Sequence, residues 1–232
     1  MNFNAKTDQN ALMIFVKYPE PGKVKTRLYP EISLSKAAEL YKAMVDDIIT
    51  THSDNIDYEI IICYAPAERI DDFNVWLGDR YTLKAQRGPN LGDRLINAFS
   101  QVFSDGFNKA IVIGSDCPQI SRTEIEAAFD ALNNRDIVIG PTEDGGYYLI
   151  GMSKLHEAAF RNISWSSDKV LGETLEILSK KRLSVDRLNS KFDIDTYRDV
   201  VRLREYLENG KPEVSTQNTL KTLGLDMSQL EE

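Results

Sequence analysis

A short Pro- and Gly-rich segment near the start of the chain carries the first residues suited to chemistry. The segment runs from Lys17 to Leu28 and holds four basic side chains: Lys17, Lys23, Lys25 and Arg27. Pro19 and Pro21 restrict the backbone, while Gly22 permits close approach to a ligand. Charge-assisted donors such as Lys and Arg, with the Thr26 hydroxyl, suit phosphate oxygens, so we expect nucleotide binding here. The segment matches neither GxxxxGK[ST] nor GxGxxG, and a solvated basic loop is the alternative interpretation.

A carboxylate follows the third apolar run of the chain, Ala110 to Ile113, in the sequence Gly114-Ser115-Asp116-Cys117-Pro118. A carboxylate placed just beyond the end of a strand can hold a hard cation that also binds phosphate oxygens. We therefore predict that Asp116 binds a divalent metal and is essential for catalysis. The alternative is an aspartate that only caps a turn.

The pattern of apolar residues predicts the elements that position these side chains. Runs rich in β-branched residues predict buried strands at 11–17, 58–64, 109–114 and 136–140, with further strands at 147–150 and 183–188. Amphipathic periodicity predicts helices at 34–49, 91–102, 124–132 and 169–179, and a last helix after Thr196. This alternation predicts an α/β fold, a three-layer α/β/α sandwich with a mostly parallel central sheet, whose ligands bind at the carboxyl ends of the strands.

Length and composition fit one domain. The chain has 232 residues, 42% of them hydrophobic and 28% charged, with a net charge of −8. We expect a single domain over residues 11–208 and a polar tail over 209–232 that is either disordered or a short peripheral helix. Leu220, Leu223 and Leu225 could dock this tail on the domain.

The same composition limits the partners. An acidic protein does not favour nucleic acid or anionic lipid, and the apolar run at 11–16 is too short for a membrane span or an export signal. We expect a cytoplasmic monomer or weak homodimer with no nucleic-acid or membrane partner. Cys63 and Cys117 lack zinc-site spacing, so reduced buried thiols are expected.

Two further segments contain candidate ligand-binding residues. The turn Glu143-Asp144-Gly145-Gly146 and Tyr147 after it predict an acceptor site, with Asp144 as a general base and Tyr147 or Tyr148 stacking on a substrate. Trp165 is a further acceptor-side candidate, although an aromatic anchor is equally consistent. The turn before the helix at 91–102 offers Asn90, Gly92 and Asp93 for nucleotide binding.

Four ordered motifs resemble the DUF2064 group of GT-A-fold transferases. They are Pro21 to Leu28, Gly114 to Pro118, Gly140 to Leu149, and Asp193-Ile194-Asp195-Thr196, and the resemblance covers roughly residues 11–207. It implies the nucleotide-diphospho-sugar transferase fold and a metal, Mg²⁺ or Mn²⁺, on Asp116. It also implies Asp195 as a second metal ligand, with a helix cap as the alternative. Many GT-A glycosyltransferases carry Asp-x-Asp, whereas Ser115-Asp116-Cys117 offers one carboxylate.

The resemblance and the motifs together predict a metal-dependent transferase that uses a nucleotide-activated donor. The first expectation is glycosyl transfer from a nucleotide-diphospho-sugar to a small-molecule acceptor, with Lys25 and its basic neighbours offsetting charge on the phosphates. The alternative is a nucleotidyltransferase that joins a nucleoside triphosphate to a phosphorylated or carboxylated metabolite and releases pyrophosphate. A second alternative is a nucleotide-binding module without turnover.

Overall fold

A seven-stranded sheet forms the centre of the protein. The computed structural model describes residues 10–54, 57–209 and 217–224. The strands lie in the order β3-β2-β1-β4-β6-β5-β7, and their bounds are β1 Asn10–Lys17, β2 Tyr58–Ala65, β3 Thr82–Ala85, β4 Lys109–Ile113, β5 Ile137–Pro141, β6 Tyr147–Met152 and β7 Val185–Arg187. Only β6 runs antiparallel to its neighbours, so the prediction of a mostly parallel sheet is confirmed.

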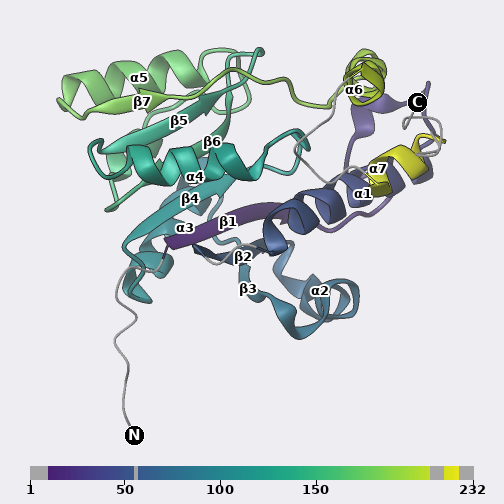
Figure 1. Ribbon diagram of the computed structural model, residues 1–232, viewed down its shortest axis with the longest axis horizontal. Coiled ribbons are helices and arrows are strands. Elements are labelled where there is room, and N and C mark those ends of the chain that lie inside the picture. The colour runs from purple at the N-terminus through teal and green to yellow at the C-terminus, as the bar shows by residue number, and fades with distance from the viewer. Residues whose placement is uncertain (1–9, 55–56, 210–216, 225–232) are drawn as a thin grey trace, which may run out of the picture.

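Helices cover both faces of this sheet (Figure 1). Their bounds are α1 Leu34–Ser53, α2 Ile70–Leu77, α3 Leu91–Ser104, α4 Arg122–Ala131, α5 Val170–Lys180, α6 Tyr197–Asn209 and α7 Gln217–Thr222, with short 3₁₀ helices η1 Thr26–Leu28, η2 Ala67–Arg69, η3 Gly78–Arg80 and η4 Glu157–Phe160. Alternate residues of β1 face opposite layers: Leu12 packs with α1, α2 and α4, whereas Met13 packs with α3 and α5. The three-layer α/β/α sandwich is therefore confirmed.

The sequence-based prediction was incomplete between β2 and β4. It placed one helix there, whereas the structure has α2, β3 and then α3. Strand β3 is four residues long and lies at the edge of the sheet, where its side chains are at most partly buried. It lacks the continuous apolar run of a central strand, because an edge strand has fewer covering neighbours.

A third apolar cluster ties the basic segment to the C-terminal helices. Leu28 of η1 packs with Leu40 and Met44 of α1 and with Leu203 of α6 in this cluster. Helix α7 lies on α1, where the Asp47 carboxylate accepts hydrogen bonds from the amides of the first turn of α7 (Figure 1). Residues 217–222 are thus helical, whereas Leu225 lies outside the described residues.

Among the described residues, every helix is too short or too polar to cross a membrane.

Candidate active site

A cleft opens between the carboxyl ends of β1 and β4. The strand order reverses between these two neighbours, and such a switch point is where open α/β sheets bind ligands. The cleft has a volume of about 520 Å³. It brings together the predicted residues Lys17, Lys23, Lys25, Thr26, Arg27, Asp116, Tyr147 and Asp195.

Lys25 is the centre of charge in this cleft. Its ammonium forms ion pairs with Asp116 and, at 3.4 Å, with Asp195, and Arg27 lies 3.3 Å from the other oxygen of Asp195. The Lys25 side chain is 3% exposed, whereas both carboxylates are nearly half exposed. Lys25 also has a φ of 49°, a left-handed conformation that is uncommon for a residue with a side chain. The backbone therefore holds a buried cation between two carboxylates that face the cleft.

Backbone and side-chain hydrogen bonds fix the two carboxylate segments. The Ile194 amide donates to the Asp116 carbonyl at 2.9 Å, so the segments on either side of Lys25 are joined directly. Beside them, the Tyr41 hydroxyl lies 2.8 Å from Ser115 Oγ and accepts a hydrogen bond from the Lys17 amide. Burial and then the Asp116 charge raise the pKa of Tyr41, so its hydroxyl stays protonated.

The structure distinguishes between the two interpretations of Asp195. The cap of α6 is made by Asp199, whose carboxylate accepts hydrogen bonds from the Thr196 amide and hydroxyl. The Asp195 side chain instead faces Lys25 and Arg27. The Asp195 carboxylate therefore lies at the cleft in ion pairs with Lys25 and Arg27.

Asp193 is a site residue that the sequence analysis quoted without giving it a role. Burial, followed by the charges of Asp116 and Asp144, raises its pKa to about 7. The signal that could have identified it is the spacing Asp193-Ile194-Asp195, which is an Asp-x-Asp pattern.

The carboxylates have the chemistry of a Mg²⁺ or Mn²⁺ site completed by substrate. In the described part of the chain, no three His, Cys, Asp or Glu side chains converge as a closed metal site. Mg²⁺ in phosphate-transferring enzymes is held by one or two carboxylates together with substrate phosphates, rather than by a cage of protein ligands. Asp116 and Asp195 fit that kind of site, and their roles as metal ligands stay a prediction.

The predicted nucleotide-binding residues at the start of α3 do not line the cleft. The Asn90 side chain caps the helix by accepting from the Asp93 amide at 2.9 Å, and Asp93 pairs with Arg161 at 2.8 Å. Gly92 packs against the Trp165 loop, where a Cβ atom would lie 2.8 Å from Trp165 Nε1. Their neighbours Leu91, Arg94 and Leu95 line the cleft instead. Gly22, with a φ of 78°, shapes the turn of the basic segment.

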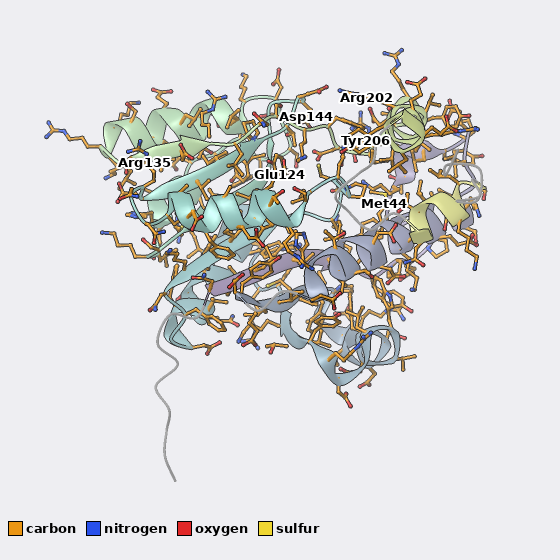
Figure 2. All side chains as sticks on the ribbon, in the orientation of Figure 1. Met44, Glu124, Arg135, Asp144, Arg202 and Tyr206 are labelled. Atoms are coloured by element: carbon orange, nitrogen blue, oxygen red, sulfur yellow. The ribbon has the colours of Figure 1, made fainter. Side chains whose placement is uncertain are left out.

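The predicted acceptor residues divide between two places. Glu143 and Asp144 line a separate cavity of about 670 Å³ next to α6, which shares Arg27 and Asp195 with the cleft. Glu143 is held by Arg202 at 2.6 and 2.7 Å, and this pairing keeps the pKa of Glu143 below its usual value. Figure 2 labels Asp144 and Arg202 on the same side of the molecule.

The turn between β5 and β6 has structural demands of its own. Asp144 accepts hydrogen bonds from the Thr142 hydroxyl at 2.6 Å and from the Gly146 amide at 3.1 Å. Gly145 has a φ of 90°, and a Cβ atom there would collide with the Asp168 backbone. The residue types of the segment Glu143-Asp144-Gly145-Gly146 are therefore explained by a tight turn as well as by a role in binding.

Tyr147 lines the cleft, whereas Trp165 lies behind it. The Trp165 ring packs edge-on against Tyr147, with ring centroids 6.4 Å apart. Ser166, next to Trp165, does line the cleft and has a left-handed φ of 66°. Strained non-glycine residues gather at functional sites, and Ser166 faces the same cleft as Lys25.

The chain is a transferase with the nucleotide-diphospho-sugar transferase fold. The structure matches that of a protein from Desulfovibrio desulfuricans G20, proposed to be a nucleotide-diphospho-sugar transferase, with 34% identity, a TM-score of 0.85, and coverage of 95% of this chain and 97% of that one. A CMP:2-keto-3-deoxy-manno-octonic acid synthetase complexed with CTP shares the fold, with 11% identity, a TM-score of 0.56, and coverage of 86% and 98%.

Residues 49–167 match the family DUF2064, described as "Uncharacterized protein conserved in bacteria". A 2-phospho-L-lactate guanylyltransferase from Methanocaldococcus jannaschii is 30% identical over 210 residues, which cover 88% of this chain and 85% of that protein. The chain belongs to the DUF2064 family, and it is a transferase. The guanylyltransferase relative agrees better with nucleotidyl transfer than with glycosyl transfer, the first expectation.

Proposed function

We propose that the protein is a nucleotidyltransferase that transfers a nucleoside monophosphate from a triphosphate, with GTP as the first candidate, to a small anionic acceptor. The observation that carries the proposal is the Lys25 ammonium held between Asp116 and Asp195 in a cleft at the switch point of the sheet. The name of the curated relative supports guanylyl transfer in particular. A phosphate or carboxylate on the acceptor is the reacting group.

The reaction needs positioning and positive charge more than proton transfer. An acceptor oxygen attacks the α-phosphorus in line, the bond to the bridging oxygen of the β-phosphate breaks, and the electron pair leaves with pyrophosphate. The acceptor oxygen is already ionised near neutral pH, so a general base is not required. Lys23, Lys25 and Arg27 would stabilise the negative charge on the phosphates.

A divalent metal completes this proposal. Asp116 and Asp195 would hold Mg²⁺ or Mn²⁺, and the ion would supply further positive charge to the phosphate oxygens. The oxygen-only donor pair agrees with either metal.

Glycosyl transfer is the second candidate, supported by the 34% identity to the Desulfovibrio protein. That reaction requires a base for the acceptor hydroxyl. Glu143 is paired with Arg202, and Asp144 accepts two hydrogen bonds within its own turn. Neither carboxylate lines the central cleft, so the geometry favours nucleotidyl transfer.

Product release distinguishes these possibilities. The protein would be incubated with each nucleoside triphosphate and 2-phospho-L-lactate, and in parallel with UDP- and GDP-sugars and sugar acceptors, with Mg²⁺, Mn²⁺ or chelator. Metal-dependent pyrophosphate supports the proposal. Release of nucleoside diphosphate from sugar donors alone would replace it with glycosyl transfer, and a nucleotide that binds without turnover would favour a non-catalytic module.

A matched pair of variants tests the site. Asp116→Ala should lower turnover by roughly 10²-fold or more, the scale for loss of a preorganised electrostatic group. Asp105→Ala is the control, because Asp105 is 47% exposed against 49% for Asp116 and also pairs with a lysine, Lys84. Near-normal turnover in folded Asp116→Ala protein would remove Asp116 from the mechanism.

A further inference from the structure

The central cleft has an apolar wall as well as a charged one. The charged residues come from the basic segment, Asp116 and Asp195, whereas side chains of the sheet and of α3 make the other wall: Phe15, Leu91, Leu95, Val112, Tyr147 and Ile150. Phe15 lies in the central strand β1, where its neighbours Ile14 and Val16 are fully buried, yet it is only partly buried because it borders the cleft. Leu95, Val112 and Ile150 are buried, so the parts of the wall that a ligand can reach are Phe15 and Tyr147, which are partly buried, and Leu91, which is exposed.

Leu91 forms the exposed rim of this wall. It is the first residue of α3 and is 43% exposed, and Leu95 lies one turn further along the same face. The helix start is fixed by the Asn90 cap and by the close packing of Gly92 on the Trp165 loop. Ligand-binding pockets are lined mainly by apolar side chains with a few polar groups, and Leu91 adds to the apolar lining of this cleft.

A second cavity lies beside the cleft and has room for a nucleoside. A cavity of about 790 Å³ adjoins the cleft and shares Lys17, Lys23, Gln86 and Arg94 with it. Three of these shared residues are cations, so they suit the phosphates that would span the two spaces. A nucleoside in the adjoining cavity would leave the apolar wall of the cleft uncovered beside the reacting centre at Lys25.

We propose that this wall binds an apolar substituent, alkyl or aryl, that the acceptor carries next to its phosphate or carboxylate, and that Leu91 determines this specificity. The inference rests on the proposed function in taking the anionic group of the acceptor to lie in the same cleft as Lys25, next to the phosphates of the donor. The charged wall holds the anionic group, and the apolar wall removes the substituent from water.

Binding of simple phosphate esters tests this inference without requiring turnover. Affinities of the full chain with Mg²⁺ would be measured by calorimetry for inorganic, methyl, propyl and phenyl phosphate. Affinity should rise with each methylene, by up to about fourfold, the factor that corresponds to a fully buried methylene. An affinity that does not depend on chain length would overturn the inference.

Two leucine variants locate the effect. Leu91→Asn should remove most of the dependence on chain length while leaving the affinity for inorganic phosphate within twofold of wild type. Leu34→Asn is the control, because Leu34 is likewise the first residue of a helix, follows the Ser33 cap and is 38% exposed, but lies outside the cleft. A Leu91→Asn protein that keeps the wild-type dependence would place the esters elsewhere and refute the inference.

The two proposals fail separately. Length-dependent, Leu91-dependent ester binding without any pyrophosphate release from triphosphates would leave the apolar subsite standing and reject nucleotidyl transfer. Pyrophosphate release with no dependence of acceptor binding on chain length would reject the subsite alone.

Discussion

Replacement of Lys25 by methionine separates a catalytic role from a structural one. Lys25→Met keeps most of the side-chain stem and removes the charge that lies between Asp116 and Asp195. If the ammonium also binds the phosphates of the donor, the variant loses a positive charge at the reacting centre. The expected loss in kcat is then about 10²- to 10³-fold, equivalent to about 3–4 kcal/mol.

The cost to folding should be smaller than the cost to catalysis. At the 3.4 Å separation from Asp195, two unit charges attract by about 5 kcal/mol at an effective dielectric constant near 20. Burying the ammonium offsets much of that attraction, and water screens the two carboxylates because they are nearly half exposed. We expect the free energy of unfolding to fall by about 1–2 kcal/mol, since the variant leaves two like charges close together.

Pyrophosphate release at saturating triphosphate would measure kcat, and urea unfolding would measure stability. The control is Lys36→Met, which removes an exposed ion pair with Glu39 at 3.2 Å and should change neither quantity by much. Lys25→Arg restores the charge and should recover part of the activity. If Lys25→Met folds and retains kcat within threefold of wild type, Lys25 has no role in the reaction.

Two further predictions concern residues away from the centre of the cleft. Asp144→Asn should lower kcat by less than about tenfold, because the amide oxygen can still accept hydrogen bonds from Thr142 and Gly146 and nucleotidyl transfer needs no general base. A loss of 10²-fold or more, the range of general-base catalysis, would restore Asp144 as a general base. Burial, followed by the Arg122 charge, lowers the pKa of His52 to about 4, so the unfolded chain takes up a proton that the folded protein excludes. The contribution of His52 to the free energy of unfolding should therefore be fully present above pH 6.5 and fall as the pH is lowered, by about 2 kcal/mol between pH 7 and pH 5 in urea unfolding. His52→Gln should remove that part of the pH dependence. An unchanged dependence of stability on pH in the variant would contradict the assignment.

The central strands were predictable because both of their faces are covered. β1, β2, β4 and β5 are nearly all buried, and this produces the continuous β-branched runs that predict a strand. β3 reads Thr-Leu-Lys-Ala at an edge and gives no such run. The helix α2 before it has only eight residues, of which Phe73 and Leu77 are buried. It was missed because so short a helix gives only a short apolar pattern.

The site was predicted segment by segment, but its pairing was not. The basic segment and the two aspartates each stood out through residue type and position at the end of an element. Lys25 and Asp195 are 170 residues apart, and their contact depends on the left-handed backbone of Lys25 and on the packing of Leu28 with α1 and α6. No local sequence pattern contains that information.

Local patterns also indicated chemistry where the structure shows a different use. The Asn90 side chain accepts from the Asp93 amide at the start of α3, the Asp93 carboxylate pairs with Arg161, and Gly92 permits close packing on Trp165. These residue types favour anion binding and helix capping equally, because both depend on the free amides of a first turn. Only the position of the neighbouring cleft distinguishes the two uses.

The charge of the cleft gives a physical reason to expect a divalent metal. The protein as a whole is acidic, with a net charge of −8, yet the cleft is lined by five basic side chains and two acidic ones. Asp116 and Asp195 cancel part of that local positive charge. This is unfavourable for binding a triphosphate unless the two carboxylates also hold a divalent metal ion. If they did not, replacing both by asparagine would strengthen triphosphate binding. If they hold Mg²⁺ or Mn²⁺, the same double replacement should weaken triphosphate binding when metal is present and strengthen it in chelator, and this change of sign tests the metal role without reference to turnover.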